Sequence, residues 1–233
     1  MLAIVDGNRP AETRAMWLRY LRINLFYSLI QPFSAHMRRR RMDRFVRCMS
    51  LRDGLRVLDL GGQPEIWAHV PHALHVTLLN LPGVHHDVAP STHTFEHLDG
   101  DACDARQFGD NSFDIVFSNS VIEHVGPQDK QAAFAAEAQR LGKAYWVQTP
   151  AIWFPIEAHS GLPFWWFYPQ ALRNRLLRRW DKTLPEWSQY IRETRVVARD
   201  DLAQLFPDAQ IYVERVLGIP KSYVAWSRDP TSG

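Results

Sequence analysis

Residues 56–62 read Arg-Val-Leu-Asp-Leu-Gly-Gly, and this stretch decides the fold. A short apolar run that ends in an acid and two glycines is typical of a buried parallel strand that turns sharply into a helix. Glycine allows backbone conformations closed to other residues and lets a ligand approach the main chain. Because ligands of open α/β sheets bind beyond the carboxyl ends of the strands, the turn at Gly61 and Gly62 is the first candidate binding site.

Residues 111–125 contain a second buried strand, at about 113–118, that also ends in polar side chains. Strands and helices alternate on either side of it, which favours a largely parallel sheet. We expect further strands at about 74–80, 95–99, 143–148, 210–216 and 221–227, and helices at 128–141 and 171–180. Gly142 should end the first of these helices, and Gly218 to Pro220 should form the turn between the last two strands.

The charge of the chain is unevenly distributed. The 233 residues carry a net charge of +2, but residues 1–50 hold ten arginines and three acidic residues, or +7, which leaves −5 for the remainder. We expect residues 1–50 to form a helical arm. One interpretation is a lid that packs on the sheet; the other is a basic, aromatic arm that touches a membrane surface or an anionic substrate.

Cysteine usage and hydropathy place the chain among reduced cytoplasmic proteins. Cys48 and Cys103 are too few for a disulfide framework or a zinc site. Residues 1–20 lack the continuous apolar stretch of a secretory signal. No run reaches the roughly 18 apolar residues that a membrane-spanning helix needs.

Four sequence elements, in this order and spacing, resemble the class I S-adenosylmethionine-dependent methyltransferases, and most closely the methyltransferase type 11 group. They are Val57 to Gly62, Asp99 to Ala102, Ser112 to Asp114 and Ser118 to Val125. The resemblance covers about residues 55–150. It implies an α/β, Rossmann-like sheet of seven mostly parallel strands with helices on both faces and one antiparallel edge strand. The methyltransferase domain would span residues 51–233, with an acceptor-binding insertion at about 150–200.

The resemblance also assigns the cofactor, S-adenosyl-L-methionine, to particular residues. Gly61 and Gly62 would approach its methionine part, and Asp59 would bind the ammonium directly or through water. Asn80 stands where the family has an acid that binds the ribose hydroxyls, and its carbonyl oxygen can still accept a hydrogen bond. The sequence departs from the family at Gln63 to Glu65, where a further glycine is usual.

Two later segments complete the expected cofactor site. Asp101 and Ala102 match the element that reads adenine, through the acid side chain and the next backbone N–H. Asn119 follows the fourth strand and would lie beside the methionine part. A tight turn without a ligand, and solvated loop acids, are the structural alternatives for these positions.

The resemblance points to Glu123 and His124 as the leading catalytic pair. Histidine has an ordinary pKa of about 6.5, which suits removal of a proton near neutral pH. The alternative is that His124 only shapes the cofactor pocket or caps the following helix. His159, with Glu157, is the second candidate, because its segment follows the fifth strand and overhangs the same edge. The scattered histidines of residues 69–86 have no ordered third ligand, so we expect no metal.

The acceptor is expected to lie against residues 153–169, the densest aromatic run in the chain. Aromatic rings stack on sugar faces, planar rings and membrane interfaces. The Pro155 to His159 stretch resembles methyltransferases linked to bacterial polysaccharide clusters. The sequence therefore predicts O-methylation of a small-molecule or glycan hydroxyl. A nucleic-acid or protein methyltransferase, or a non-catalytic module with the same fold, are the alternatives. Near-neutral overall charge and the absence of a nucleic-acid-binding motif argue against a nucleic-acid partner.

Overall fold

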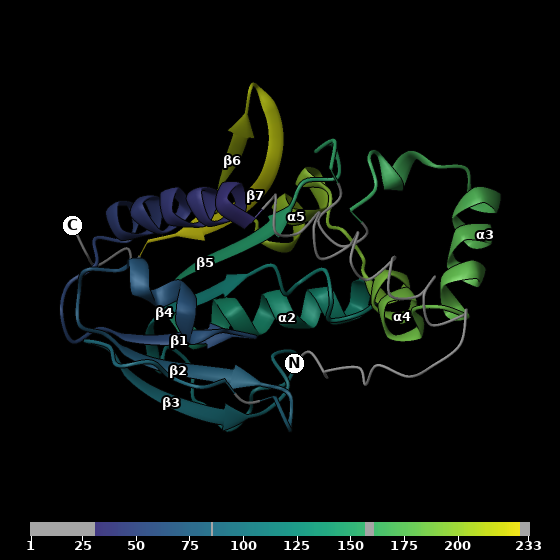
Figure 1. Cartoon of the computed structure of the whole chain (residues 1–233). Coiled ribbons are helices and arrows are strands. Elements are labelled where there is room, and N and C mark those ends of the chain that lie inside the picture. The colour runs from purple at the N-terminus through teal and green to yellow at the C-terminus, as the bar shows by residue number, and fades with distance from the viewer. Residues whose placement is uncertain (1–30, 85, 157–160, 229–233) are drawn as a thin grey trace.

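The computed structural model describes residues 31–84, 86–156 and 161–228, and it forms one seven-stranded sheet with helices on both faces (Figure 1). The strand order is β3-β2-β1-β4-β5-β7-β6. The strands are β1 (Arg56–Leu60), β2 (His75–Asn80), β3 (Thr94–Asp99), β4 (Phe113–Asn119), β5 (Gly142–Pro150), β6 (Gln210–Val216) and β7 (Ile219–Ser227). The helices are α2 (Gln128–Leu141), α3 (Gln170–Asp181), α4 (Pro185–Glu193) and α5 (Arg199–Leu205), with 3-10 turns η1 (Pro64–His69) and η2 (Trp165–Phe167) and a further helix over residues 31–48.

The central strands are buried on both faces, as the continuous apolar runs of the sequence predict. Side chains of β1 alternate between two cores: Leu58 packs with α2 and α5, whereas Val57 packs with the helix over 31–48 and η1. β1 pairs in parallel with β2 on one side and β4 on the other. This arrangement brings the carboxyl ends of β1, β2, β4 and β5 to one edge of the sheet, and confirms the predicted α/β fold.

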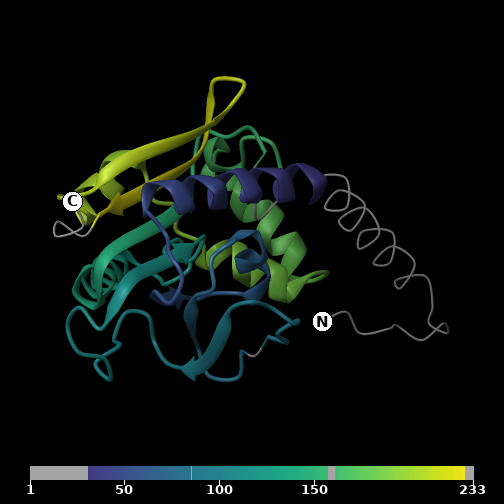
Figure 2. The ribbon, with the colours of Figure 1, turned by 90° about the vertical axis from the view of Figure 1, so that its left-hand side faces the viewer.

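The helix over residues 31–48 lies across one face of the sheet, with the β6–β7 hairpin rising beyond it (Figure 2). Met42 and Phe45 are fully buried against the sheet, and the Phe45 ring meets Phe117 of β4 edge-on at 4.9 Å. Within the described residues, the helix over residues 31–48, here called the lid helix, packs on the sheet. The rest of the expected helical arm, residues 1–30, lies outside the described part of the chain.

Three details refine the predictions. The antiparallel strand is β7, which pairs with β5 and β6 and lies second from the edge, with β6 outermost. The turn before β7 consists of Leu217 and Gly218, both with positive φ, so that Pro220 already belongs to the strand. Gly142 follows α2 with an extended backbone rather than a left-handed cap, and a Cβ there would lie 2.9 Å from the Val116 nitrogen. This glycine is required by the close passage of β4.

Helices α4 and α5 were not anticipated from the sequence. α4 has nine residues and α5 has seven, so each presents fewer than three turns of helical periodicity in the sequence. None of the helices in the described part of the chain is long and apolar enough to cross a membrane.

Candidate active site

The glycine turn after β1 forms the centre of the site. Gly61 has a φ of +71°, in the left-handed region that side chains disfavour. Its N–H donates to the Leu79 carbonyl at 2.8 Å, which ties the turn to β2. A Cβ at Gly61 would lie 2.7 Å from a methyl carbon of Val121. The turn can therefore hold only glycine at this position.

Asp59 lies beneath this turn and is almost completely buried. The indole N–H of Trp67 donates to Oδ2 at 2.8 Å, whereas Oδ1 has no hydrogen-bond partner among the described residues. Burial raises the pKa of the Asp59 carboxyl to about 7, although the Trp67 hydrogen bond acts in the opposite direction. A carboxyl group with one free oxygen beneath the turn fits a site that binds a cation, directly or through water.

Asn80 lies at the end of β2, and Asp101 lies in the loop directly after β3, as the sequence predicts. Asn80 is buried, and its amide Nδ2 donates to the Gly62 carbonyl at 3.1 Å. This bond orients the side chain and leaves the carbonyl Oδ1 as an acceptor. Asp101 is exposed; its Oδ1 accepts from the Cys103 N–H at 2.8 Å, and Oδ2 lies 3.8 Å from Lys130 Nζ. Ala102, beside it, is half-buried.

Asn119, at the end of β4, is held by an arginine from the N-terminal helix. Arg41 donates through Nη1 to Asn119 Oδ1 at 2.6 Å and to Gln148 Oε1 at 3.2 Å. Asn119 and Gln148 are paired in register across β4 and β5. Arg41 therefore clamps the lid helix to the carboxyl ends of the two central strands and leaves the Asn119 amide group as a donor.

The same arginine forms a buried ion pair with β6. Arg41 Nη2 lies 2.7 Å from Glu214 Oε2, and the two side chains are only 4% and 6% exposed. Burial alone would raise the pKa of Glu214, but Arg41 and the Ser222 hydroxyl hold that pKa below its usual value. In the sequence Arg41 is one of the ten arginines of residues 1–50, and only the packing of the helix distinguishes it from its exposed neighbours.

His124 follows β4 and pairs with Tyr190 of α4. Its Nε2 lies 3.1 Å from the Tyr190 hydroxyl, and the two rings stack with centroids 4.7 Å apart. Glu123, the neighbouring residue, is fully buried and accepts from the Thr149 hydroxyl at 3.0 Å. The expected catalytic pair thus separates: Glu123 points into the protein, while His124 lies beside an exposed tyrosine. Glu157 and His159 lie outside the described residues.

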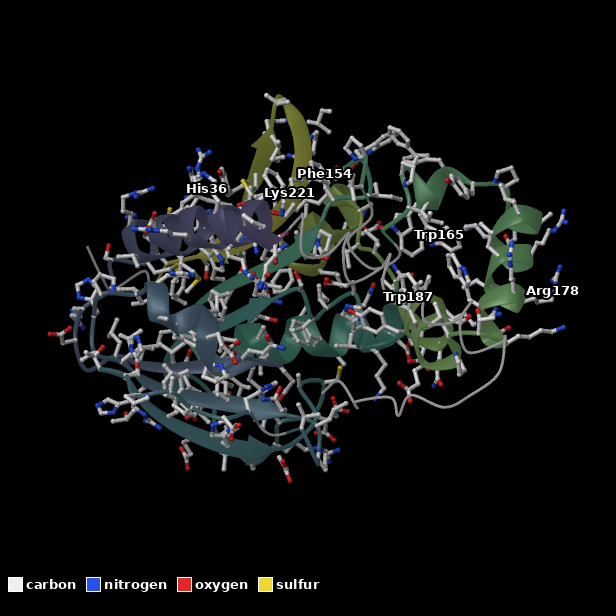
Figure 3. All side chains as sticks on the ribbon, in the orientation of Figure 1. His36, Phe154, Trp165, Arg178, Trp187 and Lys221 are labelled. Carbon is white, nitrogen blue, oxygen red and sulfur yellow. The ribbon has the colours of Figure 1, made fainter. Side chains whose placement is uncertain are left out.

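A cavity of about 870 Å³ opens beyond the N-terminus of α2. The aromatic side chains Trp165 and Trp166 contribute to its wall, as do Arg173, Arg192 and Arg195. Trp165 and Trp187 lie close together in this region, with Arg178 on the outer side of α3 (Figure 3). Part of the predicted aromatic insertion therefore forms a hydrophobic cluster and part lines a cavity.

Among residues 31–84, 86–156 and 161–228, no three His, Cys, Asp or Glu side chains gather closely enough to hold a metal ion. The structure brings Asp59, Gly61, Gly62, Asn80, Asn119 and His124 to the carboxyl edge of the sheet, with Asp101 and Ala102 in the loop that follows β3. Sequence reasoning missed Arg41, Tyr190 and the buried ion pair with Glu214.

The comparisons with known proteins agree with this arrangement. Residues 65–144 match the family model described as "Methyltransferase domain". An O-methyltransferase family protein from Burkholderia thailandensis superposes with a TM-score of 0.51 and 12% identity, covering 87% of this chain and 57% of that protein. A SAM-dependent methyltransferase from Archaeoglobus fulgidus gives 0.50 and 13%, covering 81% and 92%. At these identities the likeness shows the fold alone. No curated protein sequence matches the chain.

Proposed function

We propose that this chain, which belongs to the class I S-adenosylmethionine-dependent methyltransferases, methylates a hydroxyl group on a small-molecule or glycan acceptor. The observation that carries the choice of a hydroxyl is the His124–Tyr190 pair at the carboxyl end of β4. A hydroxyl must lose its proton as it is methylated, so a base within hydrogen-bond reach accelerates the transfer. The chain spans 57% of the Burkholderia protein, and that protein's own acceptor is not carried over.

Several residues fit S-adenosyl-L-methionine at the carboxyl edge. The Gly61–Gly62 turn would approach its methionine part, with Asp59 beneath it and the Asn119 amide beside it. Asn80 Oδ1 would accept from a ribose hydroxyl, and Asp101 with the Ala102 N–H would read adenine. Bound there, the cofactor supplies an electrophilic methyl group, and the protein contributes position and electrostatics.

His124 would accept the proton of the acceptor hydroxyl at one ring nitrogen. Nε2 faces the Tyr190 hydroxyl, and which of the two donates depends on the tautomer of the ring. With Tyr190 donating to Nε2, the ring carries its proton on Nδ1; with Nε2 donating, Nδ1 is the unprotonated nitrogen. The Tyr190 hydroxyl thereby orients the imidazole, and Nδ1 can act as the base only in the tautomer in which Nε2 donates to that hydroxyl. Glu157 and His159 remain candidates from the sequence alone.

The cavity beyond α2 supports an acceptor of sugar-like character. Its wall combines indole rings, which stack on sugar faces, with arginine and glutamine side chains that hydrogen-bond to hydroxyl or phosphate oxygens. About 870 Å³ is enough for a mono- or disaccharide-sized group. We therefore infer a glycan acceptor, consistent with a role in polysaccharide biosynthesis.

A lipid-linked acceptor would bring the chain to a membrane surface. Arg38, Arg39 and Arg40 are exposed on the lid helix, and Leu217 at the tip of the β6–β7 hairpin is 97% exposed. Exposed basic and apolar groups together favour anionic bilayers. Sedimentation with anionic vesicles tests this contact: wild type should bind more than Leu217→Ser, and binding to neutral vesicles alone would contradict it.

The function is tested by incubating extract fractions with cofactor labelled in its methyl group. Label should enter a small-molecule or glycan fraction as an O-methyl group; label in protein or nucleic acid would contradict the proposal. On the identified acceptor, His124→Ala should lower kcat by about 10²- to 10⁴-fold, with cofactor affinity changed less than twofold. Tyr190→Phe, which keeps the ring stack, should lose less. Full turnover in His124→Ala would show that positioning alone suffices.

A further inference from the structure

The buried cation Arg41 and the partly buried cation Lys221 face a single carboxylate, Glu214 of β6, at the start of β7. Arg41 Nη2 and Lys221 Nζ lie 2.7 Å and 4.0 Å from the same oxygen of Glu214, and the Ser222 hydroxyl donates to that oxygen at 2.6 Å. The side chains of Arg41 and Glu214 are nearly inaccessible, and Lys221 is 18% exposed. With Lys221 protonated, the cluster therefore carries one unneutralised positive charge.

The two cations differ in how far their hydrogen bonds are satisfied. Arg41 donates to Asn119, Gln148 and Glu214. Within the described residues, the Lys221 ammonium makes no hydrogen bond: it has only the 4.0 Å approach to Glu214 and the Phe154 ring at 6.0 Å. An ammonium has three donors, and burying it without acceptors is costly. Within the described residues, the Lys221 ammonium therefore lacks acceptor oxygens for its three donors.

The charges around Lys221 favour an incoming anion. Burial, followed by the charge of Arg41, lowers the pKa of Lys221 to about 8; Glu214 acts in the opposite direction, and Arg38 adds to the lowering. Arg38 and Arg41 lie on the lid helix and Glu214 on β6, so these are the charged groups facing Lys221. At neutral pH the ammonium is charged, and an anion beside it would raise its pKa.

Lys221 lies beside the carboxyl end of β5, at the same edge of the sheet as the glycine turn. Its carbonyl accepts from the Ala151 N–H at 2.9 Å, directly after β5. Figure 3 shows Lys221 near Phe154, which belongs to the segment after β5, with the lid helix that carries His36 beside them. In the order β1-β4-β5-β7, Lys221 is three strands from the glycine turn, or about 14 Å at the usual strand spacing. That separation places it away from a ligand held on β1 and β2.

We propose that Lys221, supported by Arg41, binds an anionic group of the methyl acceptor, a phosphate or a carboxylate. The inference rests on the proposed function, because it names the class of acceptor that this methyltransferase takes. Glu214 neutralises the positive charge of Arg41, so the positive charge of Lys221 is the one available to the ligand.

The chain has only four lysines, Lys130, Lys143, Lys182 and Lys221, which makes the site open to direct observation. The experiment follows the carbon next to each lysine ammonium by NMR in the full-length protein labelled with ¹³C-lysine. Inorganic phosphate is titrated at pH 7 and constant ionic strength, and acetate is titrated separately. The Lys221 signal, assigned by its absence in Lys221→Met, should shift saturably, and its pKa should rise by at least half a unit in phosphate.

Matched variants separate the site from general charge effects. Lys221→Met should weaken phosphate binding at least tenfold, and Lys221→Arg should retain it. Lys143→Met removes the same charge at the other end of β5, where Lys143 pairs with Asp114 at 2.8 Å, and should change nothing. S-adenosylmethionine affinity, measured separately, should stay within twofold in all three variants.

Three results would overturn the inference. They are an unresponsive Lys221 signal in the wild type, unchanged phosphate binding in Lys221→Met, and a loss of cofactor affinity equal to the loss of phosphate affinity. The last result would assign the site to the cofactor carboxylate. If phosphate binds at Lys221 while no methyl transfer occurs on any fraction, the anion site stands and the proposed function fails.

Discussion

The carboxyl group of Asp59 occupies the space in which a side chain at Gly62 would begin. A Cβ on Gly62 would lie 2.1 Å from both the carboxyl carbon and Oδ2 of Asp59. Gly62 does not have a positive φ, so its requirement arises from this contact and not from backbone conformation. The acid and the second glycine of the turn are therefore one packing unit.

Gly62→Ala should destabilise the fold by about 1–3 kcal/mol, the usual cost of overpacking a buried site. Asp59→Ala removes the atoms that clash, so most of this cost should vanish in the double variant. Urea unfolding of the two single variants and the double variant measures the coupling. Additive losses would show that Asp59 and Gly62 do not share the space.

The buried Asp59 should also make stability depend on pH. Its pKa is about 7 in the folded chain and about 3.8 when unfolded, so the folded state holds more protons between these values. Stability should therefore fall as pH rises from about 4 to 7 and stay reduced above. Asp59→Asn cannot lose a proton, so its stability relative to wild type should improve between pH 5 and pH 8. A constant difference in unfolding free energy across this range would contradict the assignment.

A comparison of Gly61 with Gly54 separates the cost of the left-handed backbone from the cost of side-chain crowding at the turn. Both have positive φ, +71° and +81°, but a Cβ at Gly54 would meet no atom within 4 Å. Gly54→Ala should cost only the left-handed backbone, about 1–2 kcal/mol. Gly61→Ala should cost more because its Cβ also meets Val121, and it alone should weaken cofactor binding. Calorimetric titration and thermal unfolding of both variants check this, and equal effects would contradict it.

Arg41→Met should lower stability by about 3–5 kcal/mol, because it leaves the buried Glu214 carboxylate with only the Ser222 hydroxyl and the 4.0 Å approach of Lys221. Glu214→Gln in the same background should recover part of the loss. Arg39→Met, on the exposed side of the same helix, is the control and should stay within about 0.5 kcal/mol of wild type. Thermal unfolding measures all three; a loss of the same size in Arg39→Met would point to a general charge effect on the helix.

The sheet could be predicted because each strand has a local signal. Apolar runs that end near Gly61 or at Asn119 mark parallel strands by their own composition, and the seven-stranded, mostly parallel sheet was implied by a resemblance that those residues carry. Gly142 was expected only as a helix cap. The sequence does not reveal that a Cβ at this position would lie within 3 Å of the β4 backbone.

The missed parts of the site depend on contacts between distant segments. Arg41 is one of four consecutive arginines, and only the packing of the helix against β4 to β6 selects it for burial beside Glu214, 173 positions later. Tyr190 lies on a short helix 66 positions from His124. No local pattern marks either pairing, so both required the three-dimensional structure.

Calorimetric titration with S-adenosylmethionine tests the central claim most directly. The wild type should bind one equivalent. Asp101→Ala should weaken binding by about 1–3 kcal/mol, the cost of an unpaired donor on adenine, and Asp104→Ala, which removes a neighbouring exposed acid paired with Arg106, should bind as wild type. An unchanged melting temperature in Asp101→Ala would show that the loop remains folded. No binding by the wild type, or equal affinity in both variants, would contradict a cofactor site at this edge of the sheet.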